Sequence, residues 1–197
     1  MTPPPNSTAS NEFEVLIGRD AIQSRVAELG AQIGRDYAGT DRPLLLLGVL
    51  KGAAIFLADL ARAIPLDCTF DFLAASSYGR NQHSAGNVNL LKDTDAEIAG
   101  ADVLLVEDIL DTGITLNYLR KHLQLRAPRS LRIVTLLDKP ARRRQPLEAD
   151  YVGFTTEDRF VIGYGMDYAE KYRNLPDICV LPADPQVTNA MHPKEVT

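Results

Sequence analysis

The sequence lacks the features of a membrane protein and of a disulfide-stabilised fold. Cys68 and Cys179 are its two cysteines and lie far apart along the 197 residues. A disulfide framework needs more cysteines, and a structural zinc site needs more ligands. We therefore expect both thiols to be reduced residues of the core. The longest apolar runs, 44–50 and 103–106, have the length of a strand and fall far short of a membrane span.

An excess of basic residues and an apolar leader are missing as well. The 26 Asp and Glu residues outnumber the 21 Lys and Arg residues, for a formal net charge of -5. Such a chain does not offer the basic surface that generic nucleic-acid binding requires. Residues 1–11 are polar and proline-rich, which is unlike a signal peptide and indicates a disordered tail. We therefore expect a cytoplasmic protein without nucleic-acid or membrane partners.

The composition is that of an ordinary globular protein, and the length suits one domain. Hydrophobic residues make up 45% of the chain and charged residues 24%. A chain of this length can bury a sizeable core, and no internal repeat is visible. We expect a single domain over residues 12–182, with its core at about 40–140. A hood from the N-terminal segment and residues 150–182 would cover it, and 183–197 would be a loose tail.

Apolar runs alternate with amphipathic segments through the middle of the chain. This alternation predicts an α/β fold with a doubly wound, mainly parallel sheet and helices on both faces. In such sheets, ligands bind beyond the carboxyl ends of the strands. The expected strands are 14–17, 44–50, 68–75, 87–91, 103–106 and 131–137, and the expected helices are 20–39, 53–64 and a segment between 116 and 127.

One stretch, residues 103–116, combines a buried strand with acids and a small turn. Four apolar residues precede Glu107 and Asp108, and Asp111 opens a Gly/Thr turn over 112–115 that leads into a helical pattern. A strand that passes through such a turn into a helix directs free backbone N–H groups toward one point, which suits a phosphate. Carboxylates beside an anion would repel it. The ligand is therefore expected to bring hydroxyls or a metal ion as well.

Two further polar segments follow expected strands. Lys51 and Gly52 come directly after one strand, and Lys139 follows another. Because the carboxyl ends of parallel strands meet at one edge of a sheet, we expect these residues and 107–115 to surround one cleft. The long polar loop from 76 to 89 has the length typical of functional lids or mobile segments.

The stretch 103–116 resembles the phosphoribosyl-pyrophosphate signature of type I phosphoribosyltransferases. It has apolar residues, two acids, two apolar residues and then Asp-Thr-Gly-x-Thr. Other segments are similar to the hypoxanthine-guanine branch of that family and occur in its order. Met166 stands where Leu is more usual, which is a mild change. The matching segments are 50–52, 77–79, 135–140, 160–168 and 173–176.

This resemblance implies a fold, a reaction and an assembly. The fold would be that of type I phosphoribosyltransferases. The reaction would transfer the phosphoribosyl group of phosphoribosyl pyrophosphate (PRPP) to hypoxanthine or guanine, giving IMP or GMP and pyrophosphate, with Mg²⁺ as cofactor. The partners would be these small-molecule substrates, and relatives pair as homodimers or homotetramers.

The resemblance also implies roles for the residues of the signature. Asp111 would be the general acid/base near N7 of the purine. Glu107 and Asp108 would hold the ribose hydroxyls, directly or through the metal. The ribose 5-phosphate would be bound by the turn, that is by Asp111, Thr112, Gly113, Ile114 and Thr115.

A second group would bind the pyrophosphate. Lys51 and Arg173 would contact it together with the backbone of Leu50 and Gly52, and in this family the bond before the lysine is often cis. Gly52 would let the chain approach the ligand closely. Asp167 would bind the metal on this side and border the purine site.

The remaining roles concern the base and the exclusion of water. Lys139 would donate a hydrogen bond to the 6-oxo group and so select oxopurines over adenine. Phe160 would stack on the purine, and the backbone of Val161 would read its edge. Ser77 and Tyr78 belong to the loop that would close over the pyrophosphate as a lid.

Several of these residues have a simpler structural interpretation. Asp111 could be the N-cap of the following helix. Lys139 could be a snorkelling lysine at a strand end, and Phe160 a core residue. The run Arg142, Arg143 and Arg144 is expected to form a solvated face without a role.

Other protein classes fit less well. Residues 110–113 match the local string of aspartic proteases, but these are all-β and pair two such aspartates, and no second one is present. Gly163 and Gly165 lack the third glycine of a dinucleotide site, and no P-loop occurs. An RNA-binding regulatory relative of the transferases is the alternative. The acidic charge, Lys139 and the segment 160–167 argue against it.

Overall fold

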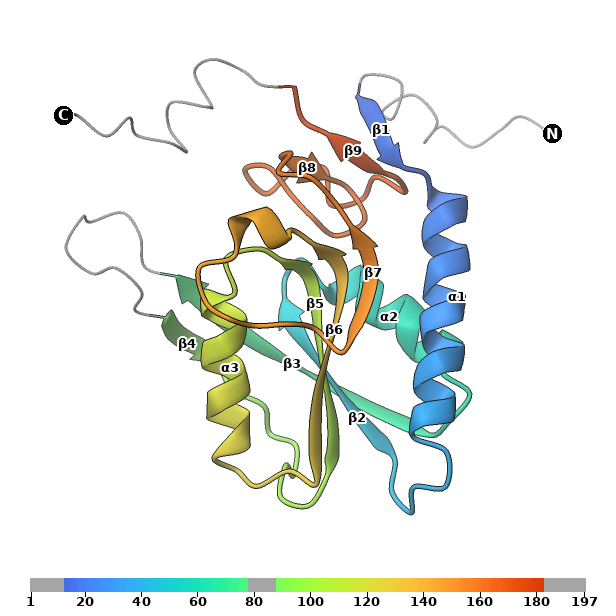
Figure 1. Cartoon of the computed structure of the whole chain (residues 1–197), viewed down its shortest axis with the longest axis vertical. Coiled ribbons are helices and arrows are strands. Elements are labelled where there is room, and N and C mark those ends of the chain that lie inside the picture. The colour runs from blue at the N-terminus through green and yellow to red at the C-terminus, as the bar shows by residue number, and fades with distance from the viewer. Residues whose placement is uncertain (1–12, 78–87, 183–197) are drawn as a thin grey trace.

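The computed structural model describes residues 13–77 and 88–182 of the chain. The expected tails, 1–11 and 183–197, and Tyr78 of the expected lid lie outside the described residues. The elements, in chain order, are β1 (Glu14–Ile17), α1 (Arg19–Asp36), β2 (Leu44–Leu50), α2 (Ala54–Ala63), β3 (Cys68–Ser77), β4 (Val88–Lys92), β5 (Asp102–Leu110), α3 (Ile114–Gln124), β6 (Ser130–Asp138), the 3-10 helix η3 (Pro140–Arg142), β7 (Tyr151–Thr155), β8 (Val161–Ile162) and β9 (Ile178–Val180) (Figure 1).

The main sheet has six strands in the order β4-β3-β2-β5-β6-β7. All neighbours are parallel except β4, which pairs with β3 antiparallel at one edge. Helices α1 and α2 cover one face, and α3 covers the other (Figure 1). Strand β2 and residues 103–106 of β5 are continuously apolar because both faces of these central strands are covered. The expected doubly wound, mainly parallel sheet is confirmed.

A smaller antiparallel sheet forms the hood. Its order is β1-β9-β8, so that the first described strand pairs with the last. Figure 1 shows this sheet beyond the carboxyl ends of β5, β6 and β7. Strand order in the main sheet reverses between β2 and β5, which opens a crevice at the carboxyl ends of these two strands. The hood therefore lies over the position where this class of sheet binds its ligands.

In helix α1, the apolar spacing of the sequence correctly predicted which residues are buried. Ile22, Val26, Leu29 and Ile33 are all buried, since residues three and four apart share one face of a helix. Several boundaries differ from expectation by one to a few residues. Helix α1 ends at Asp36 rather than near residue 39, and β5 continues to Leu110 instead of ending before its acids.

The two cysteines are not joined in a disulfide, as expected. Both thiols are free; Cys179 is buried in the hood, and Cys68 is partly buried at the start of β3. Within the described ranges, no helix has the length and apolarity that a membrane crossing requires.

Candidate active site

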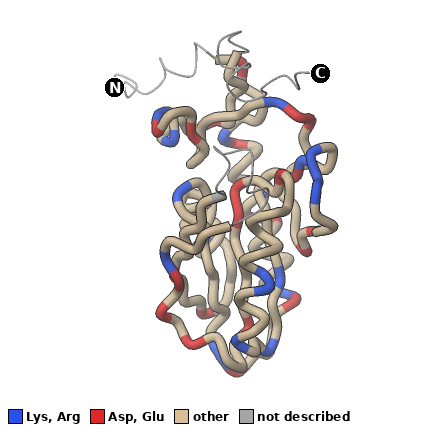
Figure 2. Tube along the Cα trace, turned by 90° about the vertical axis from the view of Figure 1, so that its left-hand side faces the viewer, with Lys and Arg blue, Asp and Glu red and all other residues tan. Residues whose placement is uncertain are grey.

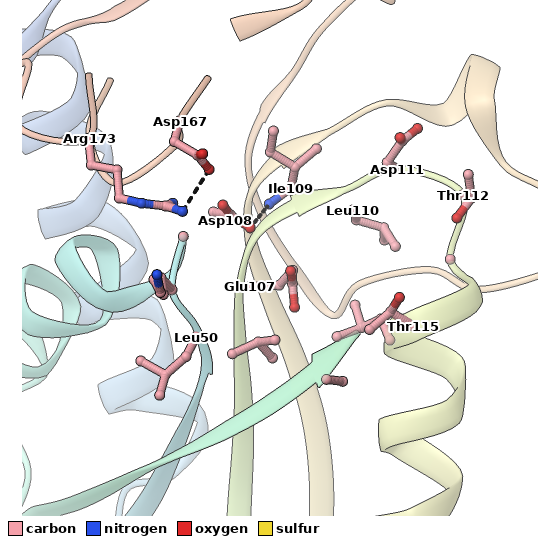
Figure 3. A pocket seen from close by; sticks show the side chains of 16 residues that line it. Leu50, Glu107, Asp108, Ile109, Leu110, Asp111, Thr112, Thr115, Asp167 and Arg173 are labelled. Atoms are coloured by element: carbon pink, nitrogen blue, oxygen red, sulfur yellow. Dashed lines mark hydrogen bonds and ion pairs between the residues drawn. The ribbon is translucent and has the colours of Figure 1, made fainter. Parts of the chain in front are cut away.

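A cleft of about 440 Å³ opens at the carboxyl ends of β2 and β5. Four parts of the chain line it: the end of β2, Ala75 of β3, the end of β5 with the turn into α3, and a loop of the hood (Figure 3). Ile114 is the one residue of the expected phosphate turn that does not line it. The lining consists of residues 49–52, Ala75, residues 107–113, Thr115, Leu116, Asp167 and Arg173.

The turn before α3 is built around Gly113. Its φ of 77° lies in the left-handed region, which glycine adopts without steric cost. Gly113 is the N-cap of α3, and the hydroxyl of Thr112 accepts the N–H of Ile114 at 3.4 Å, so Asp111 does not have the capping role. The first amides of a helix have no intrahelical partner and carry its positive dipole end. This turn can therefore bind an anion.

Glu107 and Asp108 are paired acids inside the last part of β5. Burial raises the pKa of Glu107 well above its usual range, and the adjacent Asp108 carboxylate raises it further. Burial also raises the pKa of Asp108, although its carboxylate accepts a hydrogen bond from the Ile109 N–H at 2.8 Å. No described residue donates a hydrogen bond to Oε2 of Glu107. Two desolvated carboxylates, one of them unpartnered, fit a cation.

The donor set suits Mg²⁺ better than a cation that needs many protein ligands. Among the described residues, no group of three or more His, Cys, Asp or Glu side chains could hold a metal. Mg²⁺ is commonly bound through one or two carboxylates, with waters and substrate oxygens completing its octahedron. Glu107 and Asp108 could hold it in this way.

The end of β2 approaches these acids very closely. The peptide bond between Leu50 and Lys51 is cis, as expected. A Cβ atom on Gly52 would overlap the carboxylate of Asp108, and one on Gly165 would overlap the carbonyl oxygen of Gly52. The turn after β2 therefore lies directly against the Asp108 side chain of β5 and against the backbone of the hood at Gly165.

The hood contributes Arg173 and Asp167, which form an ion pair of 2.7 Å (Figure 3). Arg173 also donates to the carbonyl oxygen of Gly165 at 2.8 Å. Glu170, which the sequence did not single out, lies 3.0 Å from Nζ of Lys51. The spacing of Asp167, Glu170 and Arg173, three residues apart in a turn-rich segment, was the one available signal. It could not show that Glu170 meets a lysine of β2.

Of the residues expected at the purine, Asp167 lines this cleft, whereas Lys139, Phe160 and Val161 lie outside its lining. Lys139 is 7% exposed, and its ammonium donates to the carbonyl oxygen of Arg159 at 2.6 Å. Burial lowers the pKa of Lys139, so it is not a snorkelling surface lysine. Phe160 is not a core residue: it is 38% exposed, with its ring edge-on to Tyr168. Val161 is buried in β8. Lys139 is connected to the cleft because its backbone N–H donates to the carbonyl oxygen of Leu110 at 3.0 Å.

The arginine run contradicts the expectation of a solvated face. Nε of Arg142 forms an ion pair of 2.8 Å with the Asp111 carboxylate. Arg143 donates to the backbone carbonyl oxygens of Leu110, at 2.9 Å, and of Asp111. It also pairs with Asp138 at the end of β6. Only Arg144 has the expected exposure. Sequence alone did not reveal this, because the turn at η3 decides which arginines point inward.

Acidic and basic residues are interspersed along the trace outside the cleft (Figure 2). The lining differs from this, since it carries four acids, Glu107, Asp108, Asp111 and Asp167, and two cations, Lys51 and Arg173. Such a site suits a ligand that combines negative groups with hydroxyls or a metal.

Comparison with known proteins agrees with this geometry. The family model for the phosphoribosyl transferase domain matches residues 18–169. The chain is 52% identical to the hypoxanthine-guanine phosphoribosyltransferase of Mycobacterium tuberculosis over 177 residues, which cover 88% of this chain and 87% of that protein. The chain belongs to the hypoxanthine-guanine phosphoribosyltransferase family. It is therefore an enzyme, and the resemblance seen in the sequence is confirmed.

Solved structures of hypoxanthine phosphoribosyltransferases share the fold. The structure from Staphylococcus aureus superposes with a TM-score of 0.85 at 47% identity and covers 93% of this chain and 98% of its own. A ternary substrates complex of the Trypanosoma cruzi enzyme has a TM-score of 0.82 at 43% identity and covers 90% and 99%. The type I phosphoribosyltransferase fold is thus shown for this chain.

Proposed function

We propose that this enzyme transfers the phosphoribosyl group of PRPP to hypoxanthine or guanine and releases pyrophosphate, with Mg²⁺ as cofactor. The supporting observation is one cleft in which the turn before α3, the acids of β5 and a pair of cations converge. A phosphate, a ribose and a pyrophosphoryl group need these three kinds of partner.

The turn before α3 would bind the ribose 5-phosphate. Thr112, Gly113 and Thr115 line the cleft, and Gly113 gives the backbone its left-handed turn. Backbone N–H groups at a helix start bind phosphate without any lysine or arginine. The binding energy of this remote group would hold the reacting carbon in position.

Glu107 and Asp108 would hold the ribose hydroxyls and Mg²⁺. Their pKa values are raised by burial, so a bound cation stabilises their ionised forms. Mg²⁺ held by these two carboxylates would supply positive charge to stabilise the departing pyrophosphate. Asp167 would serve the metal from the opposite side of the cleft, where it now pairs with Arg173.

Lys51 and Arg173 would bind the pyrophosphate, with the backbone of residues 50–52. Both side chains reach the cleft from opposite elements, one from β2 and one from the hood. The loop that contains Ser77 and Tyr78 would close over the leaving group and exclude water.

Asp111 would act as the general acid/base at N7 of the purine. Its carboxylate lines the cleft between the phosphate turn and Lys139, and Arg142 holds one of its oxygens. An ammonium has three N–H donors, and the Arg159 carbonyl oxygen takes one from Lys139. Another would select the 6-oxo group over the amino group of adenine. Phe160 would stack on the base and Val161 would read its edge.

The decisive experiment is an assay of pyrophosphate release. Purified protein is mixed with PRPP and hypoxanthine, guanine, xanthine or adenine, with Mg²⁺ or with EDTA. We expect release with hypoxanthine or guanine, little with adenine and none with EDTA. Absence of release with every 6-oxopurine would overturn the proposed function, and undiminished release in EDTA would overturn the Mg²⁺ requirement alone.

A further inference from the structure

Both cations that line the cleft are already ion-paired with acids of the hood. Nζ of Lys51 lies 3.0 Å from Oε2 of Glu170, and the same oxygen lies 3.3 Å from the guanidinium of Arg173. Arg173 is paired with Asp167 as well. In the part of the chain that the structure describes, one carboxylate oxygen therefore bridges the two cations proposed to bind pyrophosphate.

The two acids are held very differently. The carboxylate of Asp167 is 29% exposed, accepts the backbone N–H of Glu170 at 2.8 Å and pairs with Arg173. The side chain of Glu170 is 66% exposed and contacts the two cations, Lys51 and Arg173. Arg173 would keep its place without Glu170, because it also donates to the Gly165 carbonyl oxygen. Of the two acids, Glu170 is thus the one whose carboxylate can move away from the cations with the smaller loss of interactions.

The charge of Glu170 is suited to this contact. Hydrogen bonds from Lys51 and Arg173 hold the pKa of its carboxyl below the usual range, so it is ionised at neutral pH. An incoming pyrophosphate also presents anionic oxygens to both cations. It must therefore compete with Glu170 for the same N–H donors.

We propose that Glu170 is a displaceable counter-ion for the pyrophosphate site. Its carboxylate neutralises Lys51 and Arg173 in the free enzyme and is exchanged for the pyrophosphoryl group on binding. This inference rests on the proposed function, which assigns pyrophosphate to these two cations. The exchange weakens pyrophosphate binding and thereby speeds the loss of this product. Lys51 and Arg173 meanwhile remain arranged for the next substrate.

The test is calorimetric titration of Mg-pyrophosphate into the wild type and the Glu170→Gln variant. Gln keeps the shape of the side chain but no longer competes as an anion. Two exposed ion pairs contribute little each, so we expect Kd to fall by about threefold to tenfold. KM for PRPP and the inhibition constant of pyrophosphate should fall with it. Glu97→Gln removes the same charge at an exposed site away from the cleft and should leave all three unchanged.

A double-mutant cycle separates exchange of partners from a general charge effect. In a Lys51→Met background the bridge has lost one end, so Glu170→Gln should tighten binding by clearly less than in the wild type. An equal gain in both backgrounds overturns the inference, as does unchanged or weaker binding in Glu170→Gln alone. If the wild type itself binds no pyrophosphate, the proposed function fails and the inference fails with it. The two failures are thus distinguishable.

Discussion

Gly52 and Asp108 meet so closely that a Cβ atom on residue 52 would overlap Oδ2 of the carboxylate. The glycine ends the β2 segment of the cleft, and the acid belongs to β5, its neighbour in the main sheet. On the other side, the carbonyl oxygen of Gly52 leaves no room for a side chain at Gly165 in the hood. One small residue therefore sets the distance between the proposed pyrophosphate and metal sites.

The variant Gly52→Ala should displace the Asp108 carboxylate from its place in the cleft. A shift of about 1 Å in a reacting group can cost about 100-fold in rate, so we expect a loss of that order in kcat/KM for PRPP. Thermal unfolding should change far less than activity. The matched control is Gly18→Ala, whose new Cβ would meet only Asp177 Oδ1 at 3.9 Å. Full activity in Gly52→Ala would contradict the prediction.

Glu107 should destabilise the protein when no cation is bound. Burial and the neighbouring Asp108 carboxylate raise its pKa, which means that its charge is unfavourable in the folded state. We expect Glu107→Gln to raise Tm by a few degrees in EDTA. Mg²⁺ should stabilise the wild type more than the variant. Equal Tm shifts with Mg²⁺ would show that Glu107 does not hold the metal.

Asp111→Asn should separate chemistry from binding. Asn keeps the size of the side chain but cannot exchange a proton, so turnover should fall by about 100-fold or more. The affinity for PRPP should change much less, because the phosphate turn remains intact. Single-turnover rates and equilibrium titration of PRPP measure the two effects separately. A loss confined to affinity would refute the acid/base assignment.

The buried charge of Lys139 should lower the free energy of unfolding at neutral pH, although the residue is proposed to recognise the base. Burial lowers its pKa in the folded state, so the unfolded chain binds more protons between that pKa and the ordinary lysine value. Stability therefore rises with pH across this interval. The free energy of unfolding of the wild type, relative to that of Lys139→Met, should therefore increase as the pH rises toward the ordinary pKa of lysine, about 10.4.

The same variant should lose its preference for 6-oxopurines over adenine. Lys121→Met, which changes an exposed lysine of α3, is the control and should show neither effect. A parallel pH dependence of both variants would contradict the burial argument. Unchanged discrimination against adenine would instead contradict the role in selectivity.

Arg143 does not line the cleft, but it should hold the turn that carries Asp111 in position. It donates to the carbonyl oxygens of Leu110 and Asp111 and pairs with Asp138. Arg143→Leu removes the donor to the Asp111 carbonyl oxygen and the ion pair with Asp138, whereas Leu110 keeps the N–H of Lys139. We therefore expect a loss of about 2 kcal/mol in stability together with lower kcat. Arg143→Lys should recover the charge but not the forked geometry, and hence only part of kcat.

The neighbouring Arg144 provides the control for this prediction. Its side chain is exposed, so Arg144→Leu should leave Tm and kcat unchanged. Tm and steady-state rates would be measured for all three variants. If Arg143→Leu behaved like Arg144→Leu, the contacts to the two carbonyl oxygens would have no positioning role.

The sequence by itself determined the architecture and the main segment of the cleft. The residues that become buried can be recognised from local patterns: a continuous apolar run in β2, and apolar residues three or four apart from Ile22 to Ile33 in α1. The turn around Gly113 is local too, because its conformation depends on one residue without a Cβ. Such features can be predicted from the sequence without knowing which elements pack against them. The alternation of these segments was enough to predict the parallel sheet and the edge at which it binds ligands.

Only the tertiary structure decided which distant side chains meet. Lys51 and Glu170 are 119 residues apart, and their contact depends on how the hood loop lies over the end of β2. The inward direction of Arg143 depends likewise on the path of the chain after β6. No periodicity encodes such pairs, since they arise from the packing of whole elements rather than from the spacing within one. The expected solvated face was wrong for this reason, and Glu170 was overlooked for the same one.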